Sequence, residues 1–477
     1  MGKFLVRKVA DNGNEGFTET LEYHVMHQAN VLTNHNKHYC LELQRHPDGR
    51  HRLFTHYGRL GISNIYEVRD TVDGQPCRDY NEAKKEFDSI HKKKLSGKSV
   101  KDPETGEVSR EAYVDIEVVS PQVGSVNIRG VAEVKKTVTI KAAIDTSSYD
   151  PKISKLLDQL VKENVHNITS HTSIKYTAGG YATEIGPVTP GHVDRARVPL
   201  TELNKLMGSK GAVDASDRQV QQLNSQYFSL IPKPFSRKIA ETDMILDAKT
   251  LEAEFDVLDQ LATAVSMGSA MAGSTSARMN ALGTDIEFLN DEAEVRRIKK
   301  YIRESKAQNH QGTDVWRFDV KNIYKIKIPA ERARYEGSLK KFGNVQEVFH
   351  GSANSNILSI LKGGLIIPPV TAGFVCGRLY GNGVYGANNS SKSLNYSIGF
   401  WNGKRSSSGN AFLFLADFAM GKQHDVYDTT PGGPPRGYDS IWAHKKRPGS
   451  FSGGLWNDEL IVYTLPQCTL KYLVEME

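Results

Sequence analysis

The chain has 477 residues, of which 39% are hydrophobic and 24% charged, and its formal net charge at pH 7 is +6. These values are ordinary for globular protein, and the length suggests about three domains. We expect no transmembrane helix, because the chain has no run of 18 or more apolar residues, and the N-terminus does not resemble a secretory signal. The four cysteines are scattered, so we expect a reducing, intracellular setting without zinc fingers or disulfides: Cys40, Cys77, Cys376 and Cys468.

The N-terminal part of the chain predicts β-structure. Residues 1–20 are polar and indicate a short tail or edge, whereas residues 21–145 alternate apolar and polar side chains as strands do. The turn sequence Pro47-Asp48-Gly49 joins two such runs, because Pro presets φ and Gly accepts positive φ. The expected elements are strands at 39–44, 52–57, 113–119 and 134–144 and a helix at 82–93 capped by Asn81.

The middle of the chain, residues 150–268, changes to a helical period. Ile153, Leu156 and Leu160 open one apolar stripe with i, i+3, i+4 and i+7 spacing, and similar stripes follow around 200–206 and 251–262. Two stretches interrupt this pattern. The segment 176–190 is rich in Gly, Thr and Pro and predicts a loop, and the segment 266–282 has weak periodicity and predicts a linker.

The last part of the chain, residues 283–477, mixes short strand-like runs with helices and contains a set of polar and aromatic residues next to glycines. His350-Gly351-Ser352 follows an apolar strand, Gly383-Val384-Tyr385-Gly386 comes next, and Ser393 and Tyr396 follow. Glu459 stands at the head of another strand. Such residues are what a pocket for a flat aromatic amide joined to a sugar needs, which suggests chemistry on NAD.

The order and context of these residues resemble the catalytic domain of the poly(ADP-ribose) polymerase family. The resemblance extends upstream. The runs Asp285-Ile286-Glu287 and Lys471–Val474 are similar to the opening and closing strands of that domain, and Tyr227–Pro232 resembles the family's regulatory helical domain. Tyr57-Gly58-Arg59 resembles the Trp-Gly-Arg (WGR) motif of its DNA-sensing domain, with Tyr in place of Trp. Together these segments cover roughly residues 20–477.

The resemblance implies a multidomain α+β protein. The expected parts are a β-rich WGR-like domain at 21–145, an α-helical regulatory bundle at 150–268 and a mixed α/β ADP-ribosyltransferase catalytic domain at 283–477. The implied function is transfer of ADP-ribose from NAD, with release of nicotinamide, to protein acceptors that include the enzyme itself. The implied control is activation by DNA ends or nicks, in the nucleus of a eukaryote or the cytoplasm and nucleoid of a bacterium. The sequence specifies no accessory factor.

The resemblance also assigns roles to the nicotinamide side of the site. Gly351 is expected to pair its backbone with the carboxamide, because a residue without Cβ lets a ligand approach the main chain. The Ser393 hydroxyl would add a hydrogen bond. Tyr396 and Tyr385 would stack on the two faces of the pyridine ring. The family usually has an aromatic residue where this chain has Gly386, which predicts a looser wall.

The sugar side of the site is assigned in the same way. His350, assisted by Ser352, would hydrogen-bond the adenosine ribose. Glu459 would accept a hydrogen bond from the nicotinamide ribose and stabilise the cation that develops there. The expected catalytic residues are therefore His350, Tyr385 and Glu459, and the loop 368–378 would lie over the donor. A Glu at this place is more typical of polymer-forming relatives than of mono-transferases.

Three further expectations concern partners and metals. Tyr57, Gly58 and Arg59 would contact DNA, because the Arg fork binds two phosphate oxygens, and lysines between 84 and 101 would add salt-sensitive attraction or form an ordinary solvated face. Eight histidines fall within residues 1–91, but spacings such as His24-x-x-His27 lack a completing ligand, so we expect no metal. A mono-ADP-ribosyltransferase and an idle DNA-end-binding scaffold are the alternative functions.

Overall fold

The structure is a computed structural model, and its described residues fall into two compact units. The first unit contains residues 1–139, 168–207 and 212–268, and the second contains the remainder, as far as they are described. The predicted helical segment is thus divided between the units. The domain boundaries 21–145, 150–268 and 283–477 stay predictions. The structure describes residues 3–9, 15–59, 65–101, 108–116, 149–177, 180–183, 186–235, 239–367, 379–399, 409–430, 432–446 and 455–477.

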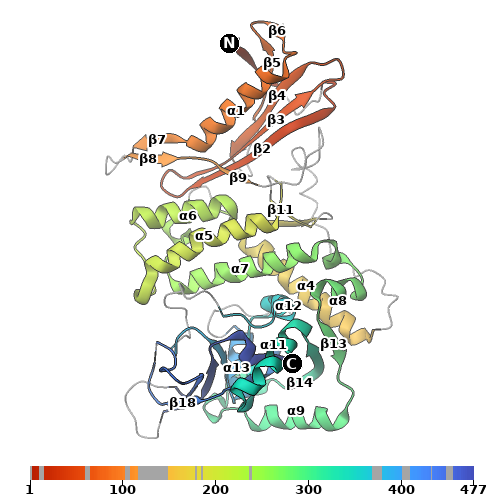
Figure 1. Ribbon diagram of the computed structural model, residues 1–477, viewed down its shortest axis with the longest axis vertical. Coiled ribbons are helices and arrows are strands. Elements are labelled where there is room, and N and C mark those ends of the chain that lie inside the picture. Colours follow the sequence, from red (N-terminus) through yellow and green to blue (C-terminus); the bar gives the residue numbers. More distant parts are fainter. Residues whose placement is uncertain are drawn as a thin grey trace. The chain divides into compact units, whose positions relative to one another are not determined.

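The first unit begins with an antiparallel sheet covered on one face by helix α1 (Tyr80–Ser96) (Figure 1). Alternating apolar residues of the strands, such as Leu41 and Leu53, pack with Phe87 of the helix. The sheet order is β1-β5-β4-β3-β2-β9, with β6 added beside β5. The strands are β1 Phe4–Val9, β2 Glu19–Asn30, β3 His35–Arg45, β4 His51–Arg59, β5 Ile65–Val72, β6 Gln75–Pro76 and β9 Val114–Ile116, and a separate hairpin joins β7 Lys98–Lys101 to β8 Val108–Glu111.

The helices of the first unit follow the predicted apolar stripes. α5 (Pro190–Met207) packs on α6 (Arg218–Leu230) and on α7 (Ala248–Met267), and α6 packs against β2 of the sheet. Two serines of α6 bond to the sheet strand directly. The Ser229 hydroxyl accepts from the backbone N–H of Ala29 at 2.7 Å, and the Ser225 hydroxyl accepts from that of Val31 at 3.1 Å.

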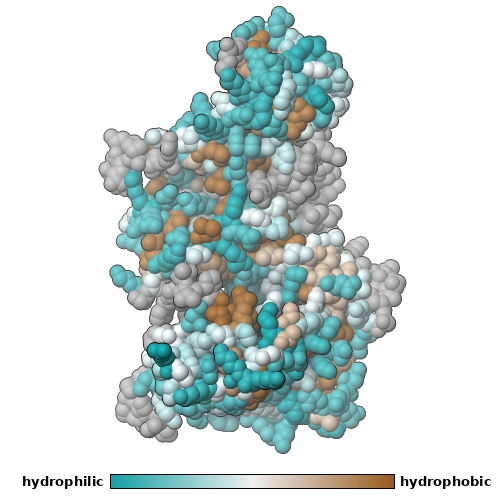
Figure 2. Space-filling view, in the orientation of Figure 1, coloured by the Kyte–Doolittle hydropathy of each residue, from teal (hydrophilic) through white to brown (hydrophobic). Residues whose placement is uncertain are grey.

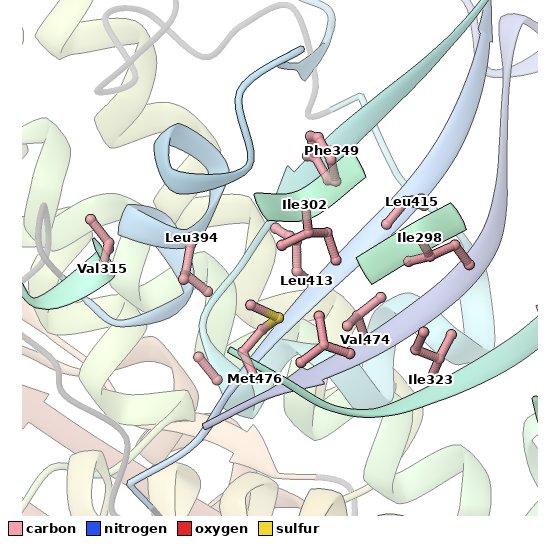
Figure 3. Close-up of a cluster of buried hydrophobic side chains, with 12 residues drawn as sticks. Ile298, Ile302, Val315, Ile323, Phe349, Leu394, Leu413, Leu415, Val474 and Met476 are labelled. Carbon is pink, nitrogen blue, oxygen red and sulfur yellow. The ribbon is translucent and has the colours of Figure 1, made fainter. Parts of the chain in front are cut away.

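The second unit contains two sheets. The larger is antiparallel with the order β13-β14-β21-β17-β15, and its core joins Phe349, Leu413 and Val474 to Ile298 of helix α9 (Figure 3). The smaller has the order β16-β20-β19-β18. The strands are β13 Asp285–Phe288, β14 Val320–Lys327, β15 Val345–Gly351, β16 Val384–Gly386, β17 Ala411–Ala419, β18 Gln423–Val426, β19 Ser440–Ala443, β20 Glu459–Val462 and β21 Cys468–Met476.

Helices surround these sheets within the second unit. The first part of α4 belongs here, since Gln159 and Asn410 exchange hydrogen bonds of 2.6 and 3.1 Å between their side-chain amides. The mixed α/β character predicted for 283–477 is confirmed. The helices are α4 Pro151–His171, α8 Thr275–Leu282, α9 Glu292–Glu304, α10 Asp314–Arg317, α11 Pro329–Phe342, α12 Asn354–Gly363 and α13 Ser390–Ser397.

The N-terminal residues 1–20, predicted as a short tail or edge, contain the edge strand β1, which pairs with β5 from Phe4 opposite Val72. Other local predictions are wrong. The predicted loop at 176–190 contains most of a three-stranded sheet, β10 Lys175–Thr177, β11 Gly180–Thr183 and β12 Gly186–Pro187. It folds because Tyr176 and Tyr181 are buried against one another, 5.0 Å between ring centroids. The predicted strand 134–144 and the loop 368–378 lie outside the described residues.

Two helix boundaries also differ from prediction. The predicted linker 266–282 contains α8, which Ser274 caps and which buries Arg278 against Asp158. Weak apolar periodicity hid this helix, because a buried ion pair supplies part of its contact surface. Helix α1 begins two residues earlier than expected, with Asp79 rather than Asn81 as the capping residue.

The exposed surface is mostly hydrophilic, with separate hydrophobic patches in the view of Figure 2. The most exposed large hydrophobic side chains among the described residues are Trp456, at 68%, and Val198, at 60%. No helix within the described residues combines the length and apolarity needed to cross a bilayer.

Candidate functional site

His350 lies at the end of β15, where an isolated bridge between Phe349 and Ala387 joins this strand to the end of β16. Its Nδ1 is 2.8 Å from the backbone carbonyl of Tyr385. A carbonyl only accepts, so Nδ1 carries the proton and Nε2 is the acceptor of the neutral ring. Burial lowers the pKa of His350 against the opposing effect of this hydrogen bond. The imidazole is therefore neutral at pH 7 and able to accept a hydroxyl hydrogen.

Gly351 has a structural reason to be glycine. A Cβ at this position would stand 1.8 Å from the carbonyl oxygen of Ser393 and 3.0 Å from the Ser397 hydroxyl. Its backbone therefore packs directly on α13, and no larger residue fits. The buried Ser393 hydroxyl donates to the carbonyl of Phe349 at 2.9 Å, which ties α13 to β15. These two predicted residues are neighbours in the structure.

The two tyrosines come from different elements of this region. Tyr385 lies on β16, and its hydroxyl donates to the carbonyl of Gly381 at 2.7 Å and accepts from the N–H of Tyr380 at 3.1 Å. Tyr396 lies on α13, three residues after Ser393, and is half-buried. Ser352 follows β15, and its hydroxyl accepts from the Asn356 amide at 3.3 Å.

Gly386 does not widen the site as predicted. A Cβ added to Gly386 would lie 2.7 Å from Val348 Cγ2 and 3.0 Å from a ring atom of Phe418. The sheet core already occupies this direction, so an aromatic side chain has no space there. The expectation of a looser wall at this residue is wrong for that reason.

Glu459 is the first residue of β20 and is only 6% exposed. Its Oε1 lies 2.9 Å from the ammonium of Lys392, on α13. Its Oε2 is buried and has no hydrogen-bond partner among the described residues. A buried carboxylate oxygen without a partner is costly, so it marks a place where a ligand hydroxyl can be accepted.

Three residues near Glu459 were missed by the sequence analysis. Lys392 also donates to the carbonyls of Asn457 and Asp458, at 2.8 and 3.2 Å. The Asp458 carboxylate accepts from the Trp442 indole at 2.9 Å and from the Lys445 N–H at 2.8 Å. These bonds fix the start of β20. The charged pair Asp458-Glu459 at a strand head was the signal that could have found this arrangement.

The third missed residue is Tyr380, which lies in the segment before β16 and is fully buried against the small sheet. Its hydroxyl has no hydrogen-bond partner among the described residues, and its backbone carbonyl accepts from the hydroxyl of Tyr463. Burial, and next the charge of Glu459, raises the pKa of Tyr380 to about 12. A second buried polar atom without a partner thus belongs to the neighbourhood of Glu459.

The predicted DNA-contact residues lie on β4 in the first unit. The Tyr57 ring stacks on Tyr39, with centroids 5.3 Å apart and planes 19° from parallel, and its hydroxyl donates to Glu67 at 2.9 Å. Burial, and next the bond to Glu67, raises the pKa of Tyr57 to about 12. The Arg59 guanidinium donates to the carbonyl of Asn34 at 2.8 Å. Gly58 lies between them, opposite His38 of β3.

Comparison with known proteins finds a family match over the part of the chain that contains most of these residues. Residues 292–452 match the poly(ADP-ribose) polymerase catalytic domain. The chain is 22% identical to human protein mono-ADP-ribosyltransferase PARP3, over 94% of this chain and 87% of that protein. It is 26% identical to maize poly [ADP-ribose] polymerase 2, over 97% of this chain and 71% of that protein. It is 25% identical to chicken poly [ADP-ribose] polymerase 1, of which it spans only 31%.

The catalytic-domain match and these relatives define an ADP-ribosyltransferase that uses NAD+ as its donor. The chain is thus similar to the poly(ADP-ribose) polymerase family, in its catalytic domain at 292–452 and, at low identity, across most of its length.

Proposed function

We propose that this protein is an intracellular, DNA-break-activated poly(ADP-ribose) polymerase that modifies itself and other proteins. The observation that carries the proposal is the state of Glu459. One carboxylate oxygen is held by Lys392, and the other is buried without a partner among the described residues. This is the arrangement that a transferase needs to hold a sugar hydroxyl and to stabilise positive charge on the same sugar.

The proposed reaction breaks the bond between the nicotinamide nitrogen and C1′ of the ribose. The bonding electrons leave with nicotinamide, and positive charge spreads over C1′ and the ring oxygen. The acceptor oxygen attacks C1′ and its proton passes to solvent. Glu459 Oε2 would accept a ribose hydroxyl hydrogen, and its negative charge would favour the cation. During elongation, the acceptor hydroxyl belongs to the previous ADP-ribose unit and would be oriented by the same carboxylate.

The other residues would hold the donor. The backbone of Gly351 would pair with the carboxamide, and the Ser393 oxygen, whose proton is directed to Phe349, would accept from the carboxamide N–H. Tyr385 and Tyr396 would stack on the pyridine ring, a contact of about 0.5–2 kcal/mol. His350, neutral and with Nε2 as acceptor, would receive a hydroxyl of the adenosine ribose.

Control by DNA is the second part of the proposal. Tyr57, Gly58 and Arg59 would meet the DNA end, and the helical segment 150–268 would restrict NAD+ entry until DNA binds. A hydrogen-bonded connection within the first unit supports this role. Asn34, which accepts from Arg59, also accepts from the backbone N–H of Ile239 at 2.9 Å, in the segment between α6 and α7.

Two alternatives follow from specific observations. Relatives named as mono-transferases and as polymerases are similarly distant, which keeps a mono-ADP-ribosyltransferase in view. A catalytically idle DNA-end-binding scaffold is disfavoured by the partnerless oxygen of Glu459, because an idle protein has no reason to maintain a buried charge.

The decisive test incubates the pure protein with labelled NAD+, with and without nicked or broken DNA, and separates the products on a gel. A DNA-dependent smear of high molecular weight is the expected result. A sharp shifted band would replace the proposal by mono-transfer. Tight DNA binding without incorporation of label from NAD+ would support the catalytically idle scaffold instead.

A further inference from the structure

Two histidines and an aspartate from distant parts of the chain meet in the first unit. His24 belongs to β2, His91 to the second half of α1 and Asp115 to β9. His91 Nε2 lies 3.0 and 2.8 Å from the two carboxylate oxygens of Asp115, and His24 Nδ1 lies 3.7 Å from one of them. One potential ligand atom from each residue falls within 4.8 Å of the others.

These separations suit a metal ion. Two ligands that each bind one ion at about 2.0–2.2 Å with tetrahedral angles stand about 3.4 Å apart. The distances from Asp115 to the two imidazoles bracket this value. Imidazole nitrogen and carboxylate oxygen are also ligands that Zn²⁺ accepts together.

The contact between the two imidazoles is unusual for a simple histidine–carboxylate pair. Their ring centroids are 3.3 Å apart and their planes differ by 7°, and the Phe87 ring also packs on His24, with centroids 5.3 Å apart. The two imidazoles and the carboxylate together present three ligand atoms to a cation.

We propose that His24, His91 and Asp115 bind a divalent ion of the zinc type, with water completing the coordination. Because the two rings are stacked, one ring would tilt toward the other on binding. The nearby Lys84 is paired with Glu22 at 3.0 Å and also with Asp88, so its charge is compensated.

The ion would add a link between α1 and the neighbouring strands β2 and β9, which already pair with each other. Asp115 is also bonded to the helices of the same unit, because the Arg195 guanidinium on α5 donates to its backbone carbonyl. A bound ion would therefore stiffen the connection between β9, α1 and α5. No metal was expected from the sequence, because only ligands close together in the chain can be recognised from their spacing. His27, the partner suggested by spacing, is buried against Asn36 and the carbonyl of Ser229.

The test uses the full, tag-free chain treated with EDTA and then dialysed. Isothermal titration with ZnCl₂ is expected to show one site of micromolar affinity or tighter, and Co²⁺ is expected to give visible d–d absorption. The melting temperature should rise by several degrees with Zn²⁺. His91→Ala and Asp115→Asn should each lose the site, at least tenfold in affinity.

His35→Ala is the matched control, because His35 also pairs with a carboxylate, that of Glu111 at 3.0 Å, but does not belong to the His24, His91 and Asp115 group. This variant should bind Zn²⁺ as the natural protein does. The melting curves of the variants in EDTA verify that they are folded. The proposal is overturned if the natural protein binds no Zn²⁺, if His91→Ala or Asp115→Asn bind it unchanged, or if His35→Ala loses it equally.

Discussion

The Lys392 ammonium lies 2.9 Å from Oε1 of Glu459 and joins helix α13 to strand β20 at the candidate site. The same ammonium donates to the carbonyls of Asn457 and Asp458, so it binds the whole start of the strand. Burial lowers the pKa of Lys392, and the charge of Glu459 opposes this effect. Lys392 is therefore a positioning residue, which leaves Oε2 of Glu459 for the substrate.

Replacing Lys392 with Met should lower kcat much more than it changes KM for NAD+. A charge-assisted hydrogen bond contributes about 1.5–3 kcal/mol, so the loss is roughly 10–150-fold in kcat. Steady-state release of nicotinamide measures it. Lys362→Met is the matched control, because this half-buried lysine donates to the backbone carbonyl of Ala281, away from Glu459 in the sequence. Equal losses in both variants would show that Lys392 acts only through stability.

Gly351→Ala should destabilise the second unit and remove activity. The added Cβ would overlap the Ser393 carbonyl, and forced overpacking costs about 1–3 kcal/mol in the free energy of unfolding. Thermal unfolding and NAD+ turnover are the measurements. Gly363→Ala, at the end of α12 with nothing within 4 Å of its Cβ position, should leave both unchanged or stabilise slightly. A stable, active Gly351→Ala would refute the close backbone contact.

Asp458 should contribute stability that acid removes. Burial would raise the pKa of Asp458, but bonds from the Lys445 N–H and the Trp442 indole outweigh burial and lower it. A carboxylate whose pKa is lowered by folding stabilises the folded state at pH values above its pKa in the unfolded chain, which is near 3.9. This stability is lost as the pH falls through the pKa of the folded state. Asp458→Asn should therefore unfold with a weaker pH dependence between about pH 5 and 3. Exposed Asp428→Asn should keep the natural dependence.

Tyr57 should act in DNA sensing through its ring and not its hydroxyl. Tyr57→Phe keeps the stack on Tyr39 and loses the bond to Glu67, a change of about 1 kcal/mol in stability. DNA stimulation of NAD+ turnover should persist in this variant and fall in Tyr57→Ala. Tyr66→Ala, which removes a ring from the neighbouring strand β5, is the control. If DNA stimulates NAD+ turnover by Tyr57→Ala as fully as in the natural protein, Tyr57 does not take part in the DNA contact.

The sequence predicted what depends on repeating patterns. The strands around 39–57 and the helices at 150–268 have clear apolar periods, and the strand ends at His350 and Glu459 follow from apolar runs. Prediction from the sequence failed where contacts between segments distant in the chain determine the structure. Lys392 was not singled out, because only the fold brings β20 beside α13. In the same way, only the fold brings His24 to His91 and Asp115. No local spacing contains such information.

Glu459→Gln gives the most direct test of the account. The amide keeps the size of the side chain and removes the negative charge, so the variant should still bind NAD+ while the rate of transfer falls by roughly 10²–10³-fold. Labelled NAD+, broken DNA and a gel that resolves chain length provide the measurement. The account predicts no long polymer from this variant, and continued long polymer would contradict the role of Glu459.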